Sequence, residues 1–89
     1  MDYYSQNSKN IFLKKKSNIL NLIREIVLFG VFEYEITKLI DLCKNLFIDN
    51  QYFKNIIDNL ESRPIYSIDD IYILEDVHKI QKFLKNYNE

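Results

Sequence analysis

The stretch FEYEITKLIDLCKNLF, residues 32–47, decides the fold class of this chain. Apolar side chains recur in it at spacings of three and four residues, with charged and amide side chains between them. Such spacing places the apolar side chains on one stripe of an amphipathic helix, and the Cys43 thiol then faces the core. The predicted stripe consists of Phe32, Ile36, Leu39, Ile40, Cys43, Leu46 and Phe47.

A second helical pattern precedes this stretch. Ser17 is suited to cap its N-terminus, because a serine hydroxyl accepts a hydrogen bond from the first turn of a helix. Gly30 stands where the left-handed residue that ends many helices would fall. We therefore predict a helix from Ser17 to Gly30. Its predicted inward face consists of Ile19, Leu22, Ile23, Ile26 and Phe29.

A third helix is predicted after residue 48. Asp49 can cap it, with Ile48 and Phe53 placed to pack across the cap as a hydrophobic staple. Pro64 disfavours helical geometry at Arg63, so the helix should stop at about residue 61 or 62. Its predicted buried face consists of Phe53, Ile56, Ile57 and Leu60.

The fourth helix is predicted to start with Ser67 as its cap and Asp70 three residues later, a pairing that resembles a capping box. Tyr66 and Ile71 would supply a second staple across this cap. The inward stripe of this helix is predicted to contain Ile73, Val77, Ile80, Leu84 and Tyr87.

Helices joined by connections this short pack as antiparallel neighbours. The predicted fold class is therefore all-α, with four short antiparallel helices arranged as a small bundle or as two stacked α-hairpins. A length of 89 residues leaves room for one core only. Residues 1–10 show no periodicity and are predicted to be a disordered tail, and residues 11–89 a single helical domain.

Composition and charge exclude several classes of protein. The net charge of −1 gives no overall attraction to nucleic acid or acidic membranes, and a single glycine excludes a glycine-rich phosphate loop. The longest apolar run, residues 26–32, is far too short to span a bilayer. The start shows no secretory pattern, so we expect an intracellular protein of the cytoplasm or an organelle matrix. Many Ile, Asn and Lys residues and no Ala indicate an AT-rich genome.

Catalytic and metal chemistry find little support in the sequence. Glu75 and His78 have the Glu-x-x-His spacing of di-iron bundles, but a second histidine is missing. Cys43 lies on an apolar stripe, where burial raises the pKa of a thiol and makes it unreactive. We therefore expect no enzyme activity, no cofactor, no metal and no small-molecule substrate.

Thirteen aromatic residues are more than four short helices can bury, and exposed aromatics anchor protein interfaces. Tyr34 and Tyr72 lie off the main stripes, so they are the predicted anchors. An acidic cluster can dock a basic partner, although acids at a helix start also stabilise the helix dipole. The predicted function is a non-enzymatic protein-binding module, either a small subunit of an assembly or a stoichiometric binder or inhibitor. The acidic residues of its predicted site are Asp69, Asp70, Glu75 and Asp76.

The alternative function is an RNA-contacting helical-repeat fragment of a ribonucleoprotein assembly. Lys14, Lys15 and Lys16 form the only run of basic residues, and they are the predicted phosphate contacts in this alternative. Such a run before a helix is usually a solvated flank, and the rest of the chain is acidic. RNA is therefore the second choice of partner, after another protein.

Overall fold

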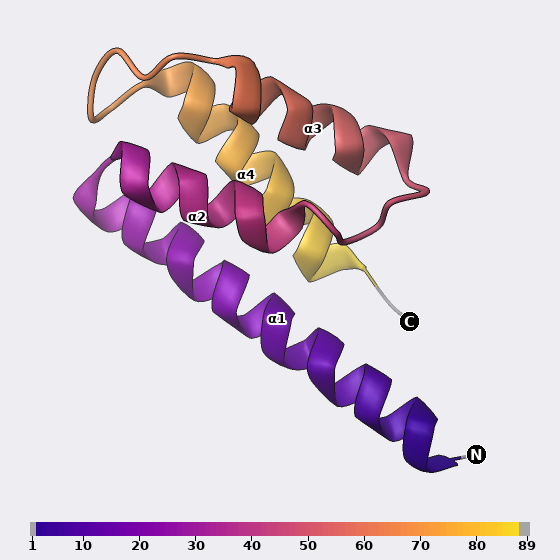
Figure 1. Cartoon of the computed structure of the whole chain (residues 1–89). Coiled ribbons are helices and arrows are strands. Elements are labelled where there is room, and N and C mark those ends of the chain that lie inside the picture. Colours follow the sequence, from indigo (N-terminus) through magenta and orange to yellow (C-terminus); the bar gives the residue numbers. More distant parts are fainter. Residues whose placement is uncertain (1, 88–89) are drawn as a thin grey trace.

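The computed structural model describes the backbone of residues 2–87 and the side chains of residues 11–87. The described residues form four helices and no strand, which confirms the all-α prediction. The helices are α1 (Asp2–Phe29), α2 (Glu33–Cys43), α3 (Gln51–Ser62) and α4 (Ile71–Asn86) (Figure 1).

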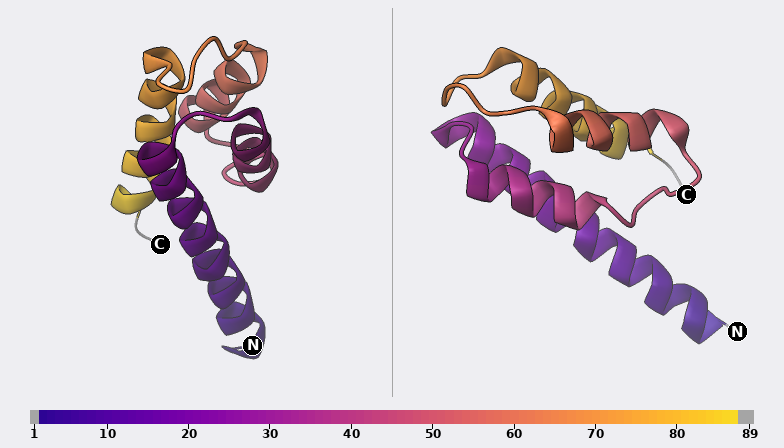
Figure 2. Two further views of the ribbon diagram at one scale, coloured as in Figure 1. Left: turned by 90° about the vertical axis from the view of Figure 1, so that its left-hand side faces the viewer. Right: turned by 45° about the horizontal axis from the view of Figure 1, so that its top comes forward.

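The helices form a closed antiparallel bundle (Figures 1 and 2). Each helix packs against two others, in the cyclic order α1, α2, α3, α4 and back to α1. The helices that face each other across the bundle, α1 with α3 and α2 with α4, do not contact directly. The N-terminal part of α1 projects well past the other three helices, so the molecule is elongated, 48 × 25 × 20 Å.

The core lies where the four apolar stripes meet. Most of the residues predicted to face inward are buried. They are Ile19, Leu22, Ile23 and Ile26 on α1, Ile36, Leu39, Ile40 and Cys43 on α2, Phe53, Ile56, Ile57 and Leu60 on α3, and Ile73, Val77, Ile80 and Leu84 on α4. Tyr87 was expected on the stripe of the fourth helix, but it follows the last residue of α4 and is 37% exposed. Phe29 and Phe32 were expected on the stripes too, and both are exposed. They flank Gly30 at the end of the bundle, beyond the reach of the neighbouring helices.

Gly30 ends α1, as the sequence indicated. Its φ of +117° lies in the region that favours glycine, and its N–H donates to the carbonyl of Ile26 at 2.9 Å. The next N–H, that of Val31, donates to the carbonyl of Ile68 in the α3–α4 connection at 2.7 Å. A Cβ at position 30 would lie 3.2 Å from both the Cβ and the carbonyl oxygen of Ile68. Glycine therefore permits both the turn and the close approach of the two connections.

The prediction that Ser17 caps the first helix is wrong, because α1 is already helical at Asp2. The apolar stripe continues past the lysine run to Phe12, whose ring contacts those of Phe47 and Tyr87 at 5.7 and 5.8 Å between centroids. These contacts come from distant parts of the sequence, which periodicity within one helix does not reveal. The backbone of residues 2–10 forms the first part of α1, and residue 1 lies outside the described residues. The disorder predicted for residues 1–10 stays a prediction.

The cap of α3 is Asn50 and not Asp49. The Asn50 side chain accepts from the Phe53 N–H at 3.0 Å, and the backbone of Phe47 turns with a φ of +52°. This turn packs the Phe47 ring against that of Phe53 at 5.0 Å and leaves Ile48 exposed, so the predicted staple is absent. The end of α3 at residue 62 and the extended Arg63 confirm the effect expected of Pro64.

The cap of α4 is Asp70 and not Ser67. The Asp70 carboxylate accepts from the N–H groups of Tyr72 and Ile73 at 3.1 and 3.2 Å, so the helix starts three residues later than predicted. Tyr66 and Ile71 are both exposed, and the staple expected between them is absent. The prediction failed because serine and aspartate can both cap a helix, and the path of the connection decides between them.

None of the helices in the described part of the chain combines the length and the apolar character that crossing a membrane requires.

Candidate protein-binding surface

One end of the bundle is built from two connections, and we call it the loop end. The α1–α2 turn (residues 30–32) and the α3–α4 connection (residues 63–70) meet there, as the views in Figure 2 show. The hydrogen bond from Val31 to the carbonyl of Ile68 holds them together. The loop end therefore joins the C-terminus of α1 and the N-termini of α2 and α4 into one surface.

Large apolar side chains are exposed around these connections. In a well-packed helical protein, such side chains are usually covered by a neighbouring helix, but here the bundle ends before covering them. Phe32 and Ile68 both lie close to Gly30, and the other exposed apolar side chains lie at the adjoining helix ends. Apolar surface that gathers in one part of a molecule can mark an interaction site. The loop-end patch consists of Leu28 (65% exposed), Phe29 (72%), Phe32 (46%), Ile68 (57%) and Ile71 (70%).

The predicted aromatic anchors lie at the same end. Tyr34 is on the first turn of α2 and Tyr72 on the first turn of α4, and both are exposed as expected, at 71% and 63%. They occupy opposite corners of the bundle, since α2 and α4 do not contact. Tyr72 also receives the guanidinium of Arg63, which lies 5.7 Å from its ring centroid. Tyr72 therefore has one face packed within the chain. Tyr34 makes no ring–ring or cation–π contact with residues 11–87.

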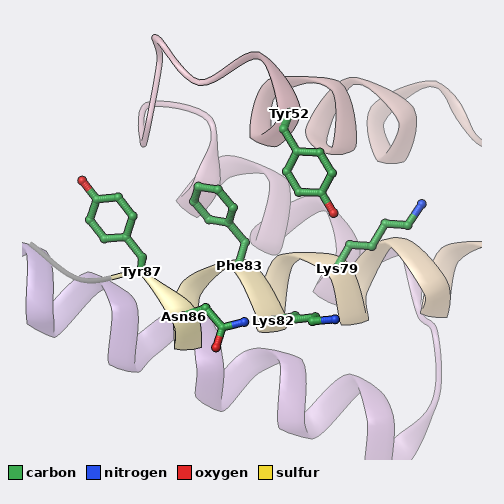
Figure 3. Close-up of a pocket in the computed structure, with 6 residues that line it drawn as sticks. All are labelled: Tyr52, Lys79, Lys82, Phe83, Asn86 and Tyr87. Carbon is green, nitrogen blue, oxygen red and sulfur yellow. The ribbon is translucent and has the colours of Figure 1, made fainter.

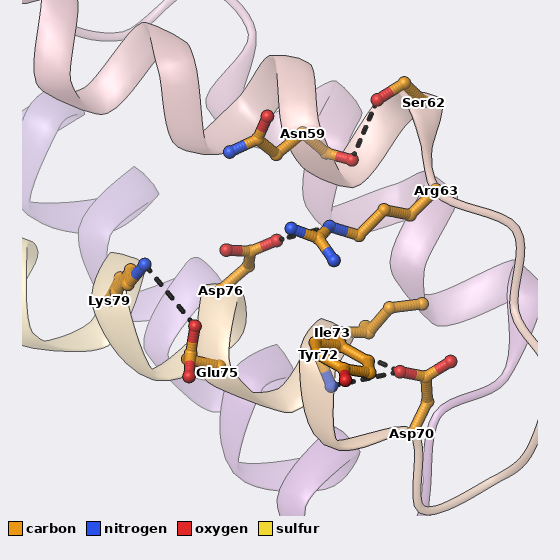
Figure 4. A network of polar contacts seen from close by, with 9 residues as sticks. All are labelled: Asn59, Ser62, Arg63, Asp70, Tyr72, Ile73, Glu75, Asp76 and Lys79. Carbon is orange, nitrogen blue, oxygen red and sulfur yellow. Dashed lines mark hydrogen bonds and ion pairs between the residues drawn. The ribbon is translucent and has the colours of Figure 1, made fainter.

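Asp70 is buried at the start of α4, where it organises the α3–α4 connection. Figure 4 shows its carboxylate accepting from the N–H groups of Tyr72 and Ile73. The carboxylate also accepts from the Tyr66 N–H at 3.4 Å, and the Asp70 N–H donates to the Ser67 carbonyl at 3.3 Å. A carboxylate at this position also interacts favourably with the helix dipole. Asp70 thus fixes the shape of the loop end from within.

Asp76 is also buried, on the second turn of α4. Burial raises the pKa of its carboxyl group, and the Arg63 guanidinium, whose Nε lies 3.3 Å from Asp76 Oδ2, partly opposes that effect (Figure 4). This ion pair ties the start of the α3–α4 connection to α4. Asp76 is therefore engaged within the fold.

The two remaining acids of the predicted cluster, Asp69 and Glu75, are exposed. Glu75 lies 3.6 Å from the ammonium of Lys79 one turn along α4, a solvent-exposed pair (Figure 4). Of the predicted acidic site, the structure thus exposes Asp69 and Glu75 and uses Asp70 and Asp76 to hold the loop end in shape.

The lysine run lies in the middle of α1, where Lys14 and Lys15 are exposed and Lys16 is half-buried. Successive residues of a helix point about 100° apart, so three in a row spread over about 200° of its surface. The three side chains therefore do not form a single line along one face of α1. This arrangement weakens the case for a phosphate-binding stripe at these residues.

The potential metal ligands of the chain include the two most reactive side-chain types, histidine and cysteine. Among the described residues, no three His, Cys, Asp or Glu side chains gather as metal ligands would. His78 is exposed. Cys43 is buried, and burial raises the pKa of its thiol to about 12.

An open hollow of about 360 Å³ lies between α3 and α4 near the other end of the bundle (Figure 3). Tyr52 stands over it from α3, with Phe83 and two lysines on α4. Other hollows between the helices have similar volumes, so size does not single this one out. The Phe83 ring also packs against Phe47 and Phe53 at 5.0 Å, closing that end of the core. The lining residues are Tyr52, Lys79, Lys82, Phe83, Asn86 and Tyr87.

No protein-family model, curated protein or solved structure matches the chain.

The loop-end patch was not foreseen, apart from the exposed tyrosines near it. Phe29 and Phe32 fit the apolar stripes and were assigned to the core, whereas Leu28, Ile68 and Ile71 fit no stripe. Their common feature in the sequence is position, since each lies within three residues of a helix end or inside a connection. Apolar residues at both ends of a glycine turn are the signal that could have indicated the patch.

Proposed function

We propose that this chain is a non-enzymatic protein–protein interaction module, a small subunit or a stoichiometric binder or inhibitor, that binds its partner through the loop end. The observation that carries this proposal is the loop-end patch, in which five large apolar side chains are between 46% and 72% exposed at one end of the bundle. Tyr34 and Tyr72 extend the surface on two sides.

Covering this patch would contribute favourable free energy to binding. Full burial of a large apolar side chain contributes roughly 1.5 to 3 kcal/mol. Phe29 and Ile71 are each about 70% exposed, so covering the two contributes about 2 to 4 kcal/mol together. A few anchors of this size account for most of the affinity in many protein interfaces.

Capture of partners from the source cells tests the proposal. The immobilised chain is compared with its Ile71→Ser and Ile48→Ser variants, because both isoleucines are exposed to nearly the same extent, 70% and 69%, at opposite ends of the bundle. We expect Ile71→Ser to lose the bound protein and Ile48→Ser to retain it. Equal retention by both variants would place the binding surface elsewhere.

Ribonuclease treatment in the same experiment separates protein from RNA binding. We expect the bound protein to resist ribonuclease. Loss of all bound material on treatment, together with its loss from a variant in which Lys14, Lys15 and Lys16 are changed to glutamine, would instead support the RNA-contacting alternative.

A further inference from the structure

We propose, on the basis of the function just proposed, that the occupant of the loop-end patch is a basic amphipathic segment of another protein. Its apolar side chains would cover the patch, and its lysines or arginines would lie against the carboxylates around it. The chemistry of the surroundings supports this choice of partner.

The segments that form the loop end contain more acidic than basic residues. Residues 27–35 and 63–76 contain six acidic residues and one basic residue, Arg63, although the whole chain has a net charge of only −1. Asp70 and Asp76 are buried and Glu75 pairs with Lys79, which leaves Glu33, Glu35 and Asp69 to face a partner. Arg63 is already paired with Asp76 and stacked over Tyr72, so it is not free to receive a partner's carboxylates.

Exposed carboxylates lie beside the apolar patch. Glu33 is the first residue of α2 and follows Phe32 in the sequence; it lines a hollow with Arg63 and Pro64 at the end of α3. Asp69 follows Ile68 and precedes the cap of α4. Neither carboxylate is within ion-pair distance of a basic side chain in the described part of the chain. Both are therefore available to basic groups of a partner that covers the patch.

The same charges disfavour a second copy of the chain as the occupant. In a twofold dimer through this end, Glu33 and Asp69 of one copy would approach the same acids of the other, and like charges brought together at an interface oppose binding. A basic partner gains from these charges instead, through faster association and discrimination against acidic competitors. An amphipathic segment supplies the apolar side chains and the basic groups on one short stretch.

The test uses three fluorescently labelled peptides of about 14 residues, titrated with the full chain and followed by fluorescence anisotropy. The first has leucines on one helical face and lysines on the other, and the second replaces every lysine with glutamate. The third has the composition of the first with its leucines scattered over all faces. We expect the leucine–lysine peptide to bind at least about tenfold more tightly than either of the others. Raising the salt concentration from about 50 to 500 mM should weaken its binding several-fold.

Variants of the chain locate the binding. Ile71→Ser should weaken binding of the leucine–lysine peptide about tenfold, and the matched Ile48→Ser should leave it unchanged. A Glu33→Gln, Asp69→Asn double variant should weaken it several-fold and reduce its dependence on salt. Circular dichroism confirms that each variant retains its helices.

Three results would overturn the proposal. In the first, the lysine and glutamate peptides bind with equal affinity. In the second, the Ile71→Ser variant binds the leucine–lysine peptide as tightly as the wild type does. In the third, sedimentation equilibrium shows that the wild-type chain is a dimer and that Ile71→Ser dissociates it. The capture experiment distinguishes these from failure of the proposed function. If Ile71→Ser still loses its cellular partner while the leucine–lysine peptide does not bind, the partner chemistry is wrong and the loop end remains the binding surface.

Discussion

Replacing Gly30 with alanine should destabilise the protein more than any other single-methyl addition at its surface. The residue has a φ of +117°, which costs a side-chain-bearing residue about 1 to 3 kcal/mol. The new Cβ would also lie 3.2 Å from the Ile68 carbonyl oxygen, which is backbone and cannot rotate away. Moving that backbone weakens the hydrogen bond from Val31, worth about 0.5 to 1.5 kcal/mol.

These contributions add up to about 2 to 4 kcal/mol, a large part of the stability of a domain of this size. The corresponding fall in melting temperature is about 10 °C or more. Urea unfolding followed by circular dichroism measures the change directly, since the midpoint should fall at a constant slope.

Ser17→Ala is the control, because it also introduces an alanine but at an exposed position within α1, where it only removes the serine hydroxyl. In the middle of a helix alanine is preferred over serine, so this variant should be as stable as the wild type or slightly more stable. A loss below about 1 kcal/mol for Gly30→Ala would refute the reasoning about the turn. If Ser17→Ala instead lowers the free energy of unfolding by about 1 kcal/mol, Ser17 acts as a helix cap after all.

The remaining predictions concern the polar and thiol groups. Asp70→Ala should lower the free energy of unfolding by about 1 to 2 kcal/mol, whereas Ser67→Ala should change it by less than about 0.5 kcal/mol; the reverse order in urea unfolding would show that serine is the cap. The pKa of the Asp76 carboxyl group is raised from its ordinary value of 3.8 in the folded state. At a pH above 3.8 the folded state therefore binds more protons than the unfolded state, so the free energy of unfolding falls as the pH rises. Asp76→Asn removes this titration, so the variant should be as stable as the wild type near pH 3 and more stable than it at pH 7. If the wild type instead becomes more stable relative to the variant as the pH rises, the argument from burial is wrong. The Cys43 thiol, with a pKa of about 12, should react with an aromatic disulfide reagent at least about 100-fold more slowly in the native than in the urea-unfolded protein, and comparable rates would mean that it is exposed.

The helices and the core could be predicted from the sequence because their signal is local. Spacings of three and four residues decide which side chains share a face, and the stripes of α2, α3 and α4 are buried as that pattern indicated. Gly30 and Pro64 also acted as expected, since their effects on the backbone depend little on the rest of the fold.

The starts of helices were harder to predict because several residues in each connection can act as caps. Asp49 and Asn50 are neighbours, and only the turn at Phe47 decides that the amide of Asn50 points at the helix. The start of α1 was missed for a related reason. Lys14 to Lys16 interrupt the apolar pattern, whereas the aromatic contacts that continue the stripe to Phe12 involve residues far along the chain.

The candidate site was predictable only in part. Tyr34 and Tyr72 were expected to be exposed because they lie off the stripes, and they are. The exposure of Phe29 could not be predicted from periodicity, because Phe29 has the same spacing as the buried residues of α1. It is exposed because the neighbouring helices do not extend far enough to cover it. The burial of Asp76 depends likewise on its pairing with Arg63 from another element.

The central claim is that the loop end is where this protein meets its partner, and photo-crosslinking tests it most directly. A benzophenone amino acid is placed at position 29 in one variant and at position 48 in another, both sites being about 70% exposed, and each is irradiated in extract of the source cells. We expect one discrete protein adduct from position 29, competed by excess wild-type chain, and none from position 48. An adduct from position 48 alone would contradict this claim and move the binding surface to the opposite end of the bundle.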